Sequence, residues 1–89
     1  MKKVDLNFQI KDLDGNDIGL ANKAFANTLM AEKSGDAVKL FDWAMTLNKS
    51  GIIEVDESDF NKIKDIIEKS ETLFIIAKAQ LLKYLLTVK

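Results

Sequence analysis

The 89-residue sequence contains no histidine, cysteine, arginine or proline. The absence of histidine removes the commonest general base near neutral pH and the commonest metal ligand. Without cysteine there is no disulfide, no thiolate metal site and no Cys–His nucleophilic pair. Without arginine, bidentate recognition of guanine or phosphate is excluded. We therefore expect a protein that is not an enzyme and that holds no cofactor or metal.

A long apolar run and an excess of one charge are also missing. Thirteen lysines stand against 14 acidic residues, so the net charge of −1 gives no global attraction to nucleic acid or anionic lipid. The most apolar stretch, residues 73–86, is interrupted by Lys78, Gln80 and Lys83 and is too short for a membrane span. No apolar run follows the two N-terminal lysines, as it would in a signal peptide. We expect a cytoplasmic protein without membrane contact.

Composition and length favour one folded domain covering residues 1–89. Apolar residues make up 47% and charged residues 30% of the chain, which is typical of a globular protein. There is no linker-like composition and no repeat of solenoid length. A chain of this size buries roughly 60–65% of its unfolded surface, so its stability margin is narrow.

The N-terminal residues predict a β-hairpin. Apolar and polar residues alternate over residues 4–11, and residues 12–17 (DLDGND) suggest the turn. We favour a type I turn with Gly15 in the left-handed bulge position, which pairs Asp12 with Asn16. A two-residue turn at Asp14-Gly15 would instead expose an apolar side chain. The favoured register places four apolar residues on one face, in the pairs Ile10–Ile18 and Phe8–Leu20.

Four helices are expected after the hairpin. The first has apolar residues at helical spacing from Ala21 to Leu29, and Gly35 is placed to end it. Asp36 is placed to cap the second helix, over residues 37–48, and Gly51 to end it. The core stripe expected for the second helix is Ala37, Leu40, Phe41, Ala44 and Leu47.

The remaining boundaries carry strong capping signals. Residues 52–55 are mostly β-branched and suggest a short third strand or an extended link. Asp56 and Asp59 fit a capping box, and Val55 and Phe60 fit a hydrophobic staple, at the start of a third helix. Ser70 is placed to cap the fourth helix. The fold class is therefore α+β, with an N-terminal β-hairpin, with or without a short third strand, packed on a four-helix bundle.

The fourth helix has two apolar faces. One face is a normal core face, formed by Leu73, Phe74, Ala77, Leu81, Tyr84, Leu85 and Val88. A second apolar stripe has heptad-like spacings of four, three and four residues, and consists of Ile75, Ala79, Leu82 and Leu86. Either the fold covers both faces, or the second stripe is covered by another copy of the chain or by a different protein.

The second stripe is the candidate protein interface, with Trp43 at its rim or, alternatively, in the core. We expect a protein-interaction or oligomerisation domain that forms a homo-oligomer or binds another protein. The other function considered is a small nucleic-acid-binding regulator. The acids that begin the second and third helices disfavour it, because a recognition helix is usually basic at its start. The DLDGND segment does not fit a calcium loop, because glycine falls at the fourth position.

Three segments resemble a group of small uncharacterised proteins encoded among phage and prophage structural genes. They are KDLDGNDI, LANKAFANTL and residues 51–85, GIIEVDESDFNKIKDIIEKSETLFIIAKAQLLKYL. The resemblance covers nearly the whole chain. It implies a non-catalytic part in virion or tail assembly, or another accessory phage role, and it transfers no functional residue.

Overall fold

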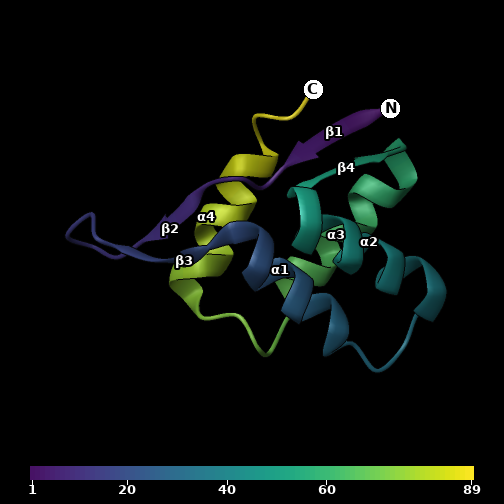
Figure 1. Ribbon diagram of the computed structural model, residues 1–89, viewed down its shortest axis with the longest axis horizontal. Coiled ribbons are helices and arrows are strands. Elements are labelled where there is room, and N and C mark those ends of the chain that lie inside the picture. Colours follow the sequence, from purple (N-terminus) through teal and green to yellow (C-terminus); the bar gives the residue numbers. More distant parts are fainter.

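The computed structural model describes residues 1–89 as an α+β structure (Figure 1). Four helices and two small antiparallel sheets confirm this class, and the short strand expected at residues 52–55 is present. A hairpin packed on a four-helix bundle is not confirmed, because the four strands form two separate sheets. The elements are β1 (Lys2–Asp5), β2 (Gln9–Lys11), β3 (Asp17–Leu20), α1 (Ala21–Met30), α2 (Ala37–Ser50), β4 (Ile52–Val55), α3 (Glu57–Lys69) and α4 (Ile75–Leu85).

The N-terminal segment is divided between the two sheets, so the single strand expected over residues 4–11 is wrong. β1 pairs with β4, and β2 pairs with β3. Between β1 and β2, the Leu6 N–H donates to the Gly51 carbonyl at 2.8 Å. The Leu6 carbonyl accepts from the Asn22 N–H at 3.1 Å. These two bonds provide partners for the backbone N–H and carbonyl of Leu6, which lies between β1 and β2 and pairs with no strand. The segment between β1 and β2 thereby connects the two sheets.

The expected hairpin turn is confirmed, but the register above it is not. The Asp12 N–H donates to the Asn16 carbonyl at 2.8 Å, and Gly15 has a left-handed φ of 87°. Further along, a bulge shifts the ladder so that Ile10 faces Gly19 instead of Ile18. The expected Phe8–Leu20 pair is wrong for the same reason, since Leu20 faces Gln9. The extra residue of the bulge leaves Ile18 and Leu20 exposed.

Three of the predicted helix boundaries are confirmed. The Asp36 carboxylate accepts from the Lys39 N–H, and the Asp56 carboxylate accepts from the Asp59 N–H, at 3.1 and 2.7 Å. Gly51 ends α2 with a φ of 77°. The second half of the capping box is wrong. The Asp59 carboxylate accepts from the Lys39 ammonium at 3.1 Å instead of from the backbone of Asp56.

Two predicted boundaries are wrong. α1 ends at Met30, because the apolar spacing that holds it against the core stops at Leu29. Gly35 has a positive φ, but it lies in the loop that leads to α2.

Ser70 does not cap the last helix, because α4 begins only at Ile75. Phe74 is the N-cap residue of α4, without a side-chain cap. The Ser70 hydroxyl instead accepts the N–H groups of Thr72 and Leu73, both at 3.2 Å. Ser70 therefore closes a turn that precedes the helix.

The core lies between the helices and the inner faces of both sheets. Phe41 and Phe74, which were expected there, are exposed, and so is Ala37. The core consists of Val4, Leu6, Ile10, Ala21, Phe25, Ala26, Leu29, Leu40, Ala44, Leu47, Ile53, Val55, Phe60, Ile63, Ile67, Leu81 and Leu85.

Candidate interaction surface

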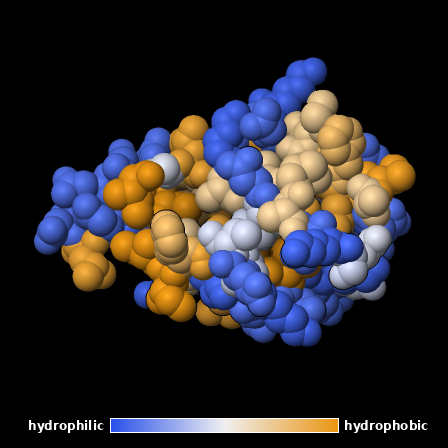
Figure 2. Space-filling model, turned by 90° about the horizontal axis from the view of Figure 1, so that it is seen from below, coloured by the Kyte–Doolittle hydropathy of each residue, from blue (hydrophilic) through white to orange (hydrophobic).

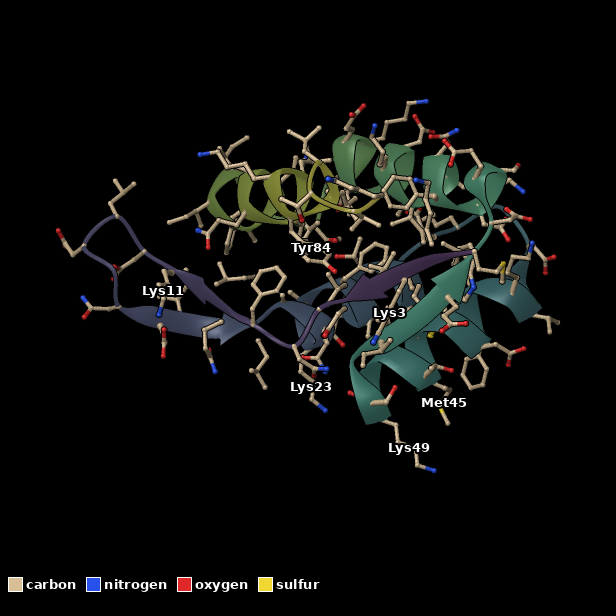
Figure 3. All side chains as sticks on the ribbon, turned by 90° about the horizontal axis from the view of Figure 1, so that it is seen from above. Lys3, Lys11, Lys23, Met45, Lys49 and Tyr84 are labelled. Carbon is tan, nitrogen blue, oxygen red and sulfur yellow. The ribbon has the colours of Figure 1, made fainter.

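Side-chain hydrogen bonds fix the orientation of α4 against both sheets. The Gln80 amide accepts from the Lys11 N–H at 2.9 Å and donates to the Lys11 carbonyl at 2.7 Å, as a paired strand would. One turn later, the Tyr84 hydroxyl accepts from the Asp5 N–H at 2.8 Å. Figure 3 shows Tyr84 pointing from α4 toward the strands, where its ring lies 5.4 Å from that of Phe8. Gln80 and Tyr84 thus determine which side of α4 faces the protein.

With α4 held in this way, Leu81 and Leu85 enter the core and are fully buried. Ala77, Tyr84 and Val88 pack against the core and are partly buried. Leu73, which precedes the helix, also packs against the core, so Phe74 is the one residue of the expected core face that is exposed.

The second stripe faces solvent for most of its length. Ile75 is 78% exposed and Leu86 is 77% exposed. Ala79 is also exposed, whereas Leu82 is partly buried against the core. We call these four residues the α4 outer face. Because the chain does not cover Ile75, Ala79 and Leu86 itself, the alternative in which the fold shields both faces of the helix does not hold for them.

The charged residues of α4 itself are all positive. No acidic residue occurs between Thr72 and Lys89. The Lys78 ammonium donates to the carbonyls of Glu68 and Ser70, at 3.1 and 2.9 Å, so it is held against the end of α3. Lys83 is exposed and is the one α4 lysine without such a bond.

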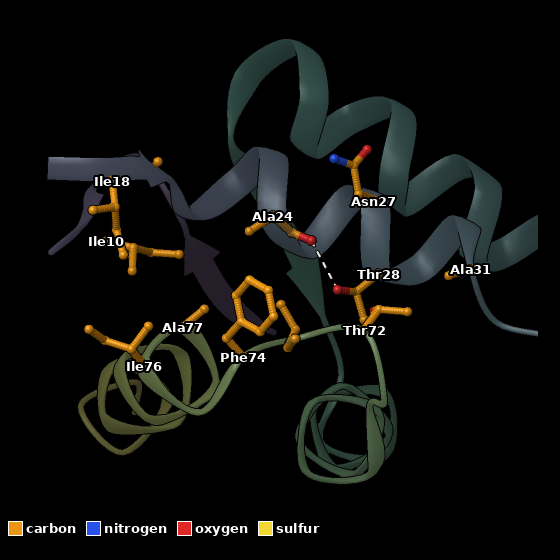
Figure 4. Close-up of a pocket in the computed structure, with 12 residues that line it drawn as sticks. Ile10, Ile18, Ala24, Asn27, Thr28, Ala31, Thr72, Phe74, Ile76 and Ala77 are labelled. Atoms are coloured by element: carbon orange, nitrogen blue, oxygen red, sulfur yellow. Dashed lines mark hydrogen bonds between the residues drawn. The ribbon is translucent and has the colours of Figure 1, made fainter. Parts of the chain in front are cut away.

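An open groove of about 370 Å³ lies next to the start of α4. Figure 4 shows Phe74, Ile76 and Ala77 on one side and Ile10 and Ile18 of the hairpin on another, with α1 above them. On the face seen in Figure 2, hydrophobic residues gather next to the hydrophilic end of the hairpin. Sequence patterning did not indicate this groove, because the bulge that exposes Ile18 and the loop that exposes Phe74 both depend on tertiary contacts.

Trp43 does not belong to the α4 outer face. It lies on α2, which packs on α1 and β4, and it is half-buried against the core. The Lys39 ammonium lies 5.8 Å from the centre of its ring. Trp43 lines a shallow hollow with Lys62 and Ile66 of α3. Trp43 thus fits the alternative in which it packs against the core, and it lies beside α3.

The acidic DLDGND segment has turn geometry. The Asp12 carboxylate accepts from the N–H groups of Asp14 and Asn16, both at 2.9 Å. The backbone N–H of Asn16 is the main cause of the lowered pKa of Asp12, and the N–H groups of Asp14 and Gly15 add to it. No group of three His, Cys, Asp or Glu side chains is arranged to hold a metal ion.

A lowered pKa makes the turn sensitive to acid. The charged Asp12 stabilises the turn at any pH above its unfolded pKa of about 3.9, and this contribution is lost as the pH falls through the lowered folded pKa. We expect the amide resonances of Asp14 and Asn16 to titrate together below about pH 4 in an NMR experiment. In Asp12→Ala this step should be absent. A wild-type Asn16 amide that does not move in this range would contradict the assigned hydrogen bonds.

Comparisons with protein-family models, with curated proteins and with solved structures gave no significant match to this chain. No helix of the structure is both long enough and apolar enough to span a membrane.

Proposed function

We propose that this chain is a non-enzymatic protein-interaction domain that works through the α4 outer face, in a homo-oligomer or bound to another protein. The observation that carries the proposal is the exposure of Ile75 and Leu86 on a helix whose opposite side is firmly anchored. An apolar stripe on a preformed helix is a suitable binding surface, because its backbone is already ordered before a partner arrives.

The energies involved are sufficient for association of moderate strength. Complete burial of an Ile or Leu side chain is worth about 1.5–3 kcal/mol. Ile75 and Leu86 are both more than three-quarters exposed, so most of this gain is still available to a partner. Two copies that bury these residues together would therefore gain about 5–9 kcal/mol. The loss of translational and rotational freedom offsets much of that gain.

The direct test is the double substitution Ile75→Glu/Leu86→Glu. Both side chains are exposed, so we expect the fold to be retained, as checked by circular dichroism and thermal melting. Burying two carboxylates is costly, and we expect the dissociation constant for self-association to rise at least about 100-fold. Analytical ultracentrifugation across the micromolar range measures this change.

Leu13→Glu is the matched control. Leu13 is 96% exposed at the hairpin turn. The substitution therefore adds a carboxylate to the surface at a position far from α4 in the sequence. It should associate like the wild type. If the wild type is still monomeric at about 1 mM, self-association through this face is excluded. Binding to another protein must then be shown by a capture that the double variant loses and Leu13→Glu keeps.

The sequence resemblance to small phage and prophage proteins suggests what kind of partner the α4 outer face would bind, namely a protein of virion or tail assembly. An accessory role in virion or tail assembly would suit a small domain that acts by contact alone. Co-expression with the products of neighbouring genes tests this role. A partner that co-purifies with wild type and Leu13→Glu, but not with Ile75→Glu/Leu86→Glu, would support it, and equal recovery with all three chains would contradict it.

The geometry gives no comparable support to the nucleic-acid alternative. Several lysines are paired with acids, as expected of a solvated mixed surface and not of a phosphate-binding stripe. The pairs are Lys2–Glu57, Lys11–Asp17, Lys39–Asp59, Lys62–Asp59 and Lys69–Asp65.

A further inference from the structure

We propose that Asp14 is a site of spontaneous isomerisation to isoaspartate, and that Asp12 protects it. The inference is independent of the α4 outer face and concerns the hairpin turn alone. Asp14 is the one aspartate or asparagine of the chain that is followed by a glycine, Gly15. Glycine has no side chain to shield its backbone nitrogen, so an aspartate before glycine is the most reactive setting for this rearrangement.

The rearrangement needs only these two residues and water. The Gly15 backbone nitrogen attacks the side-chain carboxyl carbon of Asp14 and forms a C–N bond, while the amide proton and the carboxyl OH leave together as water. The product is a five-membered succinimide ring. Water then opens the ring at either carbonyl carbon. One opening restores aspartate, and the other leaves the main chain running through the side-chain carboxyl group, as isoaspartate.

The surroundings of the turn leave room for this ring. Asp14 and Gly15 are exposed, and no atom lies within 4 Å of a Cβ atom added at Gly15. The carboxylates of Asp12 and Asp17 have partners within the hairpin, whereas the Asp14 carboxylate has none. The Asp14 side chain is therefore free to turn toward the Gly15 nitrogen.

Asp12 opposes the attack, because it binds the backbone on both sides of the reacting nitrogen. The Gly15 N–H donates to the Asp12 carbonyl at 3.1 Å. The Asp12 carboxylate accepts from the N–H groups of Asp14 and Asn16, both at 2.9 Å. These bonds direct the Gly15 N–H at Asp12 and away from the Asp14 carboxyl group, so the ring closes only after the turn opens. Loss of hydrogen bonds to a charged group shifts such a local equilibrium by about tenfold or more.

Isomerisation would change the hairpin, because isoaspartate lengthens the main chain by one methylene group. The turn is closed by the Asp12 N–H, which donates to the Asn16 carbonyl at 2.8 Å. An additional backbone atom between Asp14 and Gly15 is incompatible with both this bond and the left-handed conformation of Gly15. The isomerised chain should therefore lose the turn.

The test follows isoaspartate formation in the folded protein at neutral pH and physiological temperature. Proteolytic digestion and mass spectrometry locate the product, which has the mass of the aspartate peptide but elutes separately. We expect slow formation in the wild type and at least about tenfold faster formation in Asp12→Ala. Asp12→Asn keeps an acceptor oxygen and should give an intermediate rate. Asp14→Glu in the Asp12→Ala background should form no such product at position 14, because glutamate would have to close a six-membered ring.

Two further measurements separate the turn from the fold as a whole. Leu81→Ala weakens the core but leaves the turn intact, so while it remains folded by circular dichroism it should isomerise like the wild type. The wild type unfolded in urea gives the rate of the open chain, which Asp12→Ala should approach. Equal rates in the wild type and Asp12→Ala, or in Leu81→Ala and Asp12→Ala, would overturn the protective role of Asp12. No isoaspartate at Asp14 even in the unfolded chain would overturn the site itself.

Discussion

Leu81→Ala is expected to lower the free energy of unfolding by about 2–5 kcal/mol. Leu81 is fully buried on α4 and belongs to the core cluster, so its truncation removes apolar contacts and leaves a cavity. The total stability of a small domain is only about 5–15 kcal/mol. A loss of this size should therefore lower the melting temperature markedly. Urea denaturation followed by circular dichroism measures it.

Leu86→Ala is the matched control for Leu81→Ala. The residue type and helix are the same, but Leu86 lies just past the end of α4 and is 77% exposed. At a protein concentration too low for association, this variant should differ from the wild type by less than about 0.5 kcal/mol. If the two variants were equally destabilised, the rotation of α4 described by the structure would be wrong.

Gly51→Ala is expected to cost about 2–3 kcal/mol. Gly51 ends α2 with a φ of 77°, a conformation that is unfavourable for alanine. A Cβ atom there would lie 2.0 Å from the Asn7 Oδ1 atom, so Asn7 would have to move. That movement would break the bond from the Asn7 amide to the Ser50 carbonyl, now 2.9 Å long. Chemical denaturation measures the combined loss.

Two further variants separate the causes of this loss. In an Asn7→Ala background the collision disappears, and Gly51→Ala should cost only the backbone strain of about 1–2 kcal/mol. Gly19→Ala is the control for glycine replacement, because Gly19 has no positive φ and no atom lies within 4 Å of an added Cβ. It should change stability by less than about 0.5 kcal/mol. An equal cost at positions 19 and 51 would contradict this account.

Local hydrogen bonds explain which elements were predictable. The turn at Gly15, the caps at Asp36 and Asp56 and the stop at Gly51 involve partners no more than four residues apart. Their geometry depends on adjacent side chains and on backbone preferences, which the sequence displays directly.

The strand pairings were harder to predict from the sequence, because they join distant segments of the chain. β1 pairs with β4, about 50 residues later, and this pairing divides the expected N-terminal strand. The bulge in the hairpin depends on where α1 begins. The Ala21 N–H donates to the Phe8 carbonyl at 2.9 Å, which holds the end of β3 one residue out of the simple register. Alternation of apolar residues indicated strands but could not select among these partners.

The two apolar faces of the last helix were determined by the sequence alone, because helical periodicity fixes the angular spacing of side chains around the axis. Which face remains open was decided only by tertiary structure. The bonds from Gln80 to Lys11 and from Tyr84 to Asp5 span 69 and 79 residues, and they set the rotation of α4 about its axis. That rotation buries Leu81 and Leu85 and leaves Ile75 and Leu86 in solvent.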